Sequence, residues 1–235
     1  MMSMHTDQPI AGWDFKIFDD STVRITTFVL ILSITTVLKL QNLLSIALLI
    51  TALAIWALVQ YFFRNPDRNV LDLPGMLMGP CDGTVADITH IKEDQYLDTE
   101  SIRIGIFLSV FNVHVQRAPL AGDVTLIQHQ PGKFLPAFNP KASHENEYIA
   151  MKIESDFGAV LVKQISGILA RRCINFAQPG DRLRTGQRFG LIKFGSRVEL
   201  FLPPEAEIFV SVGDSVTGGL TKVAQMPKSG RKYES

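Results

Sequence analysis

The stretch Gly186–Pro203, which reads GQRFGLIKFGSRVELFLP, holds a serine whose hydroxyl could do chemistry. Ser196 directly follows Gly195 and lies between two apolar runs that are typical of β-strands. A serine hydroxyl becomes a nucleophile when a nearby base activates it. A Gly-Ser pair between strands is also typical of an ordinary turn, and the chain has no GxSxG motif of an α/β-hydrolase. Ser196 is therefore a candidate nucleophile whose role depends on the segments around it.

Histidines and cysteines offer little other chemistry. None of the five histidines lies in an HExxH motif or beside paired cysteines, so the sequence predicts no metal site. Cys81 and Cys173 are far apart and form no CxxC motif. They are expected to be small buried residues of a protein in a reducing compartment.

Cationic side chains are candidates for binding the anionic groups of a substrate. A guanidinium fork matches both phosphate and carboxylate, and each of these residues has the alternative of an ordinary surface cation. The candidates are Arg117, Lys141, Arg171, Arg172 and Arg197.

The overall charge excludes one class of partner. The chain has 235 residues, with 23 Lys plus Arg and 23 Asp plus Glu, so its formal net charge is zero. A protein that binds nucleic acid in bulk would show a basic excess, so no nucleic-acid partner is predicted. The length suits one sizeable domain with an appendage, or two small domains.

The N-terminal part is strongly apolar. Ile25–Phe63 contains a single charge, Lys39, and Leu43–Phe63 contains none. A helix over the latter range would reach about 30 Å, the thickness of a hydrocarbon core. The first half, Ile25–Leu38, carries five Ser or Thr and would either span with cationic ends or lie in the interface. The alternative is a buried helical hairpin of a soluble protein.

Basic residues on the flanks of this apolar part predict an orientation. Lys16 and Arg24 precede it, and Arg64 and Arg68 follow it. If both halves span the membrane, the two basic flanks fall on one side, which the positive-inside rule assigns to the cytoplasm. The chain is then expected at the cell membrane, with its remaining part on the cytoplasmic side. If only the second half spans, the orientation stays open.

The remaining sequence predicts a mostly β, α+β protein: an apolar helical hairpin or membrane helix followed by a sandwich- or barrel-like domain. Residues 1–68 form the expected membrane-attachment segment and 69–235 the catalytic domain. Only Ile165–Cys173 could begin a helix there. The strand candidates are 101–115, as one strand or two, then 122–128, 147–154, 157–164, 188–194, 197–202 and 206–212.

One short pattern occurs twice. Gly180–Gly186 and Gly213–Gly219 both follow GDx[LV]xxG, in which glycine and aspartate favour a turn before a strand. Such turns are also common in lipoyl- and biotin-carrier domains. A membrane-tethered carrier or binding module of that β type is therefore the alternative function, although neither turn is followed by a lysine placed like a carrier lysine.

Seven segments, taken together and in order, resemble the phosphatidylserine decarboxylase family in its short form with a Gly-Ser cleavage site. The resemblance covers roughly residues 60–204. The segments are Phe63–Arg68, Pro80–Gly83, Phe107–Pro119, Gly132–Phe134, Lys141–Glu147, Gln164–Arg172 and Phe194–Arg197.

The resemblance implies that the chain cuts itself between Gly195 and Ser196 and turns the serine into a pyruvoyl cofactor. The products would be a large chain, residues 1–195, and a small chain, 196–235, which remain together as a heterodimer. The pyruvoyl carbonyl would form a Schiff base with the amine of phosphatidylserine and accept electrons as CO2 leaves, giving phosphatidylethanolamine. A glycine before the serine leaves its carbonyl accessible.

The resemblance also suggests the helpers of Ser196. His114 is the candidate base and Asp82 the residue that orients it, following an Asp-His-Ser arrangement. Longer members of the family carry a second histidine three residues further on, where this chain has Arg117, so the identity of the base stays open. Arg117, Lys141 and Arg197 are the expected substrate-binding residues. A pyruvoyl enzyme for free amino acids is a further alternative, but it would leave the apolar N-terminus without a purpose.

Overall fold

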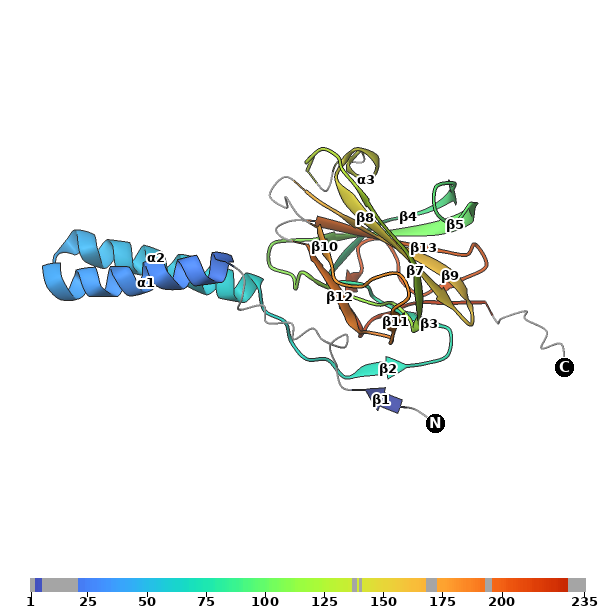
Figure 1. Ribbon diagram of the computed structural model, residues 1–235, viewed down its shortest axis with the longest axis horizontal. Coiled ribbons are helices and arrows are strands. Elements are labelled where there is room, and N and C mark those ends of the chain that lie inside the picture. Colours follow the sequence, from blue (N-terminus) through green and yellow to red (C-terminus); the bar gives the residue numbers. More distant parts are fainter. Residues whose placement is uncertain are drawn as a thin grey trace. The chain divides into compact units, whose positions relative to one another are not determined.

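The computed structural model describes residues 3–5, 21–136, 139, 141–167, 173–192 and 196–227 (Figure 1). Its contacts divide the chain into two units. One is helical and falls within Asp14–Pro66, and the other comprises Asp67 onward together with the N-terminal strand.

The helical unit is the predicted apolar hairpin. Helix α1 (Ser21–Leu40) and helix α2 (Leu43–Phe62) have 20 residues each and lie antiparallel (Figure 1). Between them Gln41 takes a positive φ of 46°, and Asn42 begins α2 by accepting a hydrogen bond from the Ser45 amide at 2.8 Å. This capping box lets the chain reverse within two residues.

Polar side chains of α1 are satisfied within the hairpin. The hydroxyl of Ser33 donates to the carbonyl of Val29 at 2.8 Å, and that of Thr36 donates to Leu32 at 2.9 Å. Between the helices, the indole of Trp56 donates to the hydroxyl of Thr27 at 3.2 Å. Both helices are long and apolar enough to cross a membrane, by length and composition.

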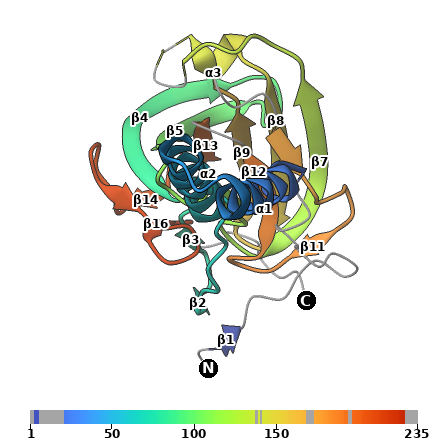
Figure 2. The same cartoon turned by 90° about the vertical axis from the view of Figure 1, so that its left-hand side faces the viewer.

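The β unit is built around an eight-stranded antiparallel sheet with a curled shape. In Figure 2 its strands β4 and β7 lie on opposite sides. The order of the strands is β11 (Arg182–Leu183), β7 (Gly122–Gln130), β8 (Tyr148–Ser155), β9 (Gly158–Ile165), β13 (Ser196–Leu202), β5 (Thr99–Leu108), β4 (Gly83–Glu93) and β15 (Ser215–Val216).

Smaller sheets and one short helix complete this unit. The three-stranded sheets are β10 (Cys173–Asn175), β12 (Arg188–Ile192) and β6 (Val115–Arg117), and β14 (Glu207–Ile208), β16 (Lys222–Gln225) and β3 (Met76–Met78). A two-stranded sheet pairs β1 (Ser3–His5) with β2 (Val70–Asp72), and helix α3 spans Ala142–Glu145.

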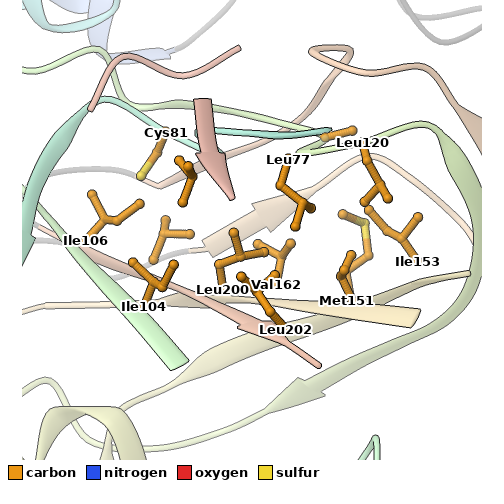
Figure 3. Packing of buried hydrophobic residues seen from close by; sticks show 14 of the residues in the cluster. Leu77, Cys81, Ile104, Ile106, Leu120, Met151, Ile153, Val162, Leu200 and Leu202 are labelled. Carbon is orange, nitrogen blue, oxygen red and sulfur yellow. The ribbon is translucent and has the colours of Figure 1, made fainter. Parts of the chain in front are cut away.

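Alternation along the strands creates one apolar interior. On β13, Val198 and Leu200 face the main core, while Arg197, Glu199 and Phe201 point to the opposite face. Figure 3 shows this packing around Leu200 and Leu202, with Ile104 and Ile106 of β5, Met151 and Ile153 of β8, and Leu77 of β3. The predicted mostly β fold is confirmed.

One local prediction differs from the structure. Ile165 ends β9 and Cys173 begins β10, so the helix suggested over that range is wrong at both ends, and residues 168–172 lie outside the described part. For the segment 101–115 the second of the two predicted alternatives holds, because β5 ends at Leu108 and a turn precedes β6. The polar residues Ser109 and Asn112 in that turn explain the break.

The repeated turn has matching geometry in both copies. Gly180 and Gly213 have φ values of 98° and 97°, and Gly186 and Gly219 both have 75°. The short strands within the two copies, β11 and β15, pair with the starts of β7 and β4 and form the two outer edges of the large sheet. The partner segments match as well: GPCDGTV at 79–85 and APLAGDV at 118–124. The β unit is therefore internally duplicated, beyond the two turns visible in the sequence.

Both cysteines are buried and free. Burial raises the pKa of Cys81 well above its ordinary value, with a further contribution from the charge of Asp82. Burial likewise raises the pKa of Cys173, with a smaller contribution from Glu147. A thiol with a raised pKa is a poor nucleophile at neutral pH, so neither cysteine suits covalent catalysis.

Candidate active site

Ser196 is the first residue of β13 and is completely buried. It is paired with Leu108 of β5 on one side. On the other side Arg197 pairs with Ile165, so the register puts Ser166 opposite Ser196. The hydroxyls of Ser196 and Ser166 are both buried and form no hydrogen bond with any described residue. Since an unsatisfied buried hydroxyl costs about 1–3 kcal/mol, this placement calls for a functional reason.

Strand alternation points both hydroxyls inward. Ser196 shares its face of β13 with Val198, and Ser166 shares its face with Gln164 of β9. The amide of Gln164 donates to Gln116 of β6 at 3.0 Å and to the Ile174 carbonyl of β10 at 3.1 Å. The site is thus a small polar region between the large sheet and the three-stranded sheet of β10, β12 and β6.

A turn after β5 positions His114. Both the amide and the hydroxyl of Ser109 donate to the side-chain oxygen of Asn112 at 2.8 Å. The carbonyl of Asn112 then accepts a hydrogen bond from Nδ1 of His114 at 2.9 Å. Because a carbonyl only accepts, Nδ1 carries the proton, and in the neutral ring Nε2 carries the lone pair that a base needs.

The backbone of His114 connects to the segment that leads into Ser196. Its carbonyl accepts a hydrogen bond from the amide of Ile192 at 3.2 Å, at the end of β12. Residues 193–195, which include Gly195, follow and lie outside the described part of the chain. His114 and Ser196 therefore flank the two ends of the predicted cleavage segment.

Asp82 lies at the same end of the large sheet. Ser196 of β13 pairs with Leu108 of β5, and the register of β5 with β4 places Gly83 opposite Leu108. Asp82, which precedes Gly83, therefore lies two strands away from Ser196. Its carboxylate accepts from the two terminal nitrogens of Arg68 at 2.7 and 2.8 Å, and from the Gly218 amide at 2.8 Å. The imidazole of His114 is held instead by Asn112. Orientation of His114 by Asp82 stays a prediction.

Loss of the Asp82 charge is expected to destabilise the fold, because the side chain of Arg68 is only 6% exposed. Asp82→Asn would leave that guanidinium without its counter-charge and cost about 3–5 kcal/mol of unfolding free energy. Urea unfolding of the detergent-solubilised protein measures this, in a Ser196→Ala background so that each variant is one uncut chain.

The matched control is Asp123→Asn, which breaks the exposed pair with Arg182 at 3.4 Å. That change is expected to cost less than about 1 kcal/mol. Equal, small losses in both variants would contradict a structural role for the Arg68–Asp82 pair.

Arg197 points away from Ser196, to the outer face of the large sheet. Its Nη2 lies 2.7 Å from Oδ2 of Asp87, and its Nε lies 2.8 Å from Oε1 of Glu199. Burial lowers the pKa of Arg197, but the charges of Glu199 and Asp87 outweigh this and raise the pKa above its usual value. The guanidinium is therefore engaged by protein carboxylates, and its predicted binding of substrate remains untested.

The other two predicted substrate-binding residues are Arg117 and Lys141. Arg117 is fully buried on the side of β6 opposite Gln116, and its Nη1 donates to the Gly186 carbonyl at 3.1 Å. Lys141 is exposed and directly precedes α3. Their roles stay predictions.

Asn146 is a site residue whose role could not be read from the sequence. Its side-chain amide donates to the carbonyls of Ser166 and Leu135, both at 2.8 Å, and its oxygen accepts from the Leu135 amide at 2.8 Å. It thereby holds the loop after β7 against the end of β9. The only sequence signal was a polar residue in the segment 141–147.

Among the described residues, no group of three His, Cys, Asp or Glu could hold a metal ion.

The sequence is similar to those of known proteins. The family model described as phosphatidylserine decarboxylase matches residues 55–224. A protein named phosphatidylserine decarboxylase proenzyme from Carboxydothermus hydrogenoformans is 44% identical over 72% of this chain and 79% of its own length. Proteins with the same name from Symbiobacterium thermophilum and Amoebophilus asiaticus are 40% and 42% identical, over 72% and 75% of this chain and 80% and 78% of their own lengths.

Proposed function

The chain belongs to the phosphatidylserine decarboxylase family and carries out that decarboxylation, and we propose that it does so with a pyruvoyl group made from its own Ser196. The observation that carries this proposal is the buried Ser196 hydroxyl, which has no hydrogen-bond partner among the described residues. It lies on the inner face of β13, toward the pair Gln164–Gln116, and Gln116 donates to the His114 carbonyl at 2.8 Å. The word proenzyme in the names of the relatives supports self-processing.

Self-processing starts at the hydroxyl of Ser196. His114 takes the proton from Oγ, which adds to the carbonyl carbon of Gly195, and the C–N bond to Ser196 breaks to give an ester. Loss of the α-proton and of the Gly195 carboxylate then leaves dehydroalanine at position 196. Addition of water with release of ammonia converts that residue to a pyruvoyl group at the start of the small chain. The Asn112 carbonyl supports this role of His114 by fixing its tautomer.

The surroundings of Ser196 fit a small carbonyl group. The position is fully buried, and the hydroxyl of Ser166 stands opposite on the neighbouring strand without a hydrogen-bond partner in the described part. Ser166 and the polar pair Gln164–Gln116 would hold the group. The chemistry that it supplies is an electron sink for loss of CO2 from an amine substrate, while the protein orients the substrate and excludes water.

The apolar hairpin suits a lipid substrate. We propose that residues 1–68 attach the chain to the cell membrane and that residues 69–235 form the catalytic domain. Arg24 and Arg64 flank the same end of the antiparallel pair, and Lys39 lies at the other end. Two cations at one end against one at the other support a cytoplasmic catalytic domain.

A vesicle assay tests the reaction. The detergent-purified chain, mixed with vesicles of phosphatidylserine labelled at the serine carboxyl, is expected to release labelled CO2 and leave phosphatidylethanolamine. Free labelled serine is the control, and it is expected to release little CO2. Fast release from free serine would support an enzyme for amino acids instead. A single uncut polypeptide with an acyl group on a lysine would support the carrier alternative.

A further inference from the structure

Glu199, Gly105 and Asp87 form a row across three strands on the outer face of the large sheet, three residues along β13 from Ser196. Glu199 of β13 pairs with Gly105 of β5, and Gly105 pairs with Asp87 of β4. The guanidinium of Arg197 lies over this row and contacts both carboxylates. It therefore connects β13 to β4, a strand that is not its neighbour in the sheet.

Gly105 makes this arrangement possible. A Cβ atom at that position would overlap the guanidinium of Arg197 and come within 2.9 Å of Oδ2 of Asp87. The absence of a side chain on β5 is thus what lets Arg197 cross the strand. A second arginine, Arg103, lies 3.2 Å from Asp87 and 3.7 Å from Glu199, so two cations balance two carboxylates.

The row is also tied to the loop that carries Asn146. The hydroxyl of Ser143, on α3, donates to Oε1 of Glu199 at 2.6 Å. Glu199 is 2% exposed and Arg197 8% exposed in their side chains, so the contacts of Glu199 are shielded from water, while the Asp87 side chain is 32% exposed. Charge-assisted hydrogen bonds in such a setting are among the stronger ones in proteins.

Self-cleavage would create a free chain end directly before Arg197. In the uncut chain residue 196 lies in the interior of the sequence, but after the cut it becomes the first residue of the small chain. Free chain ends fray unless contacts hold them down. A misplacement of about 1 Å at a reacting group can cost about 100-fold in rate. Arg197, the next residue, has its side chain fixed on the far face of the same strand.

We propose that Arg197 is a positioning residue, which with Asp87 and Glu199 holds the newly formed end of the small chain so that the group at position 196 stays in place. This inference rests on the proposed self-cleavage at Ser196. In this inference Arg197 acts on the group at position 196 by holding strand β13, and it does not contact the substrate.

Hydrogen exchange in four proteins tests the proposal: the wild type and Arg197→Lys, each in the cleaved form and in the uncut form made with Ser196→Ala. Lysine keeps the charge but cannot bridge two carboxylates through a planar fork. In the cleaved pair, Arg197→Lys is expected to speed amide exchange over residues 197–202 by roughly 10- to 100-fold. In the uncut pair the same substitution is expected to change exchange little, because the peptide bond before residue 196 is intact and the strand has no free end there.

Enzyme kinetics provides a second reading. Cleaved Arg197→Lys is expected to lower kcat by about 10- to 100-fold with KM nearly unchanged, because only the placement of the reacting group suffers. Arg182→Lys is the matched control: its pair with Asp123 is exposed, and neither exchange nor kcat should change. Gly105→Ala, which displaces the guanidinium from the other side, should repeat the exchange pattern of Arg197→Lys.

The outcomes separate the two proposals. Faster exchange of equal size in cleaved and uncut proteins would show that Arg197 is an ordinary structural residue and overturn the inference. Unchanged exchange in both would overturn it as well. If intact mass shows that the wild type is never cut, the proposed self-processing fails before exchange is measured.

Discussion

Replacing Ser196 with alanine is expected to leave one uncut chain of 26.1 kDa that releases no CO2 from phosphatidylserine. Alanine has no hydroxyl to add to the preceding carbonyl, so neither the cut nor the carbonyl group can form. The wild type should show two chains under denaturing conditions without reductant, residues 1–195 and 196–235. Intact-mass measurement distinguishes the two results, and a hydrazide reagent reports the carbonyl on the small chain.

Ser101→Ala is the matched control for this experiment. Ser101 is also a buried serine of the large sheet, on β5, but it lies at the far end from Leu108, and its hydroxyl donates to the Thr99 carbonyl. This variant should cut itself and release CO2 as the wild type does. Two chains in the Ser196→Ala protein, or CO2 release from it, would refute the assignment of Ser196.

Substituting His114 by glutamine is expected to slow self-cleavage by about 10²- to 10⁴-fold, the usual contribution of a general base. Glutamine keeps a polar side chain of similar reach next to Asn112 but cannot accept the serine proton at neutral pH. Cleavage should be followed as a time course after cell-free synthesis, because a slow cut can reach completion during purification.

His129→Gln provides the comparison for His114→Gln. His129 is 54% exposed and lies 3.1 Å from Glu147, so its loss should not change the cleavage rate. Cleavage of the His114→Gln protein at the wild-type rate would show that another group is the base. In that case the imidazole of His114 would have a structural function in the turn after β5.

The helical hairpin and the family could be predicted, because both depend on local stretches of the sequence. The hairpin follows from two apolar runs, the second of which has membrane length, and the order of segments around Ser196 pointed to the family. Strand alternation allows one further prediction, because neighbouring residues of a strand face opposite sides of the sheet. Arg197 therefore could not share the interior with Ser196 once both were placed in one strand.

Contacts between distant segments could not be predicted. Arg68 and Asp82 both lie in family-like segments, but nothing in the spacing of 14 residues shows that they pair. The hydrogen bond between Ser143 and Glu199 joins residues 56 positions apart. His114 posed a different problem, because its visible partner is a backbone carbonyl, and every residue type offers one.

The central position of β13 constrains the order of folding and the proposed cleavage. β13 has β9 on one side and β5 on the other, and later parts of the same chain form β15 and β16. The segment from β13 to β16 would therefore enter the sheets while still joined to the rest, and the proposed cleavage would follow folding. After that cleavage, no peptide bond would join the two chains. Heat inactivation would then be a one-way process, best described by a half-life.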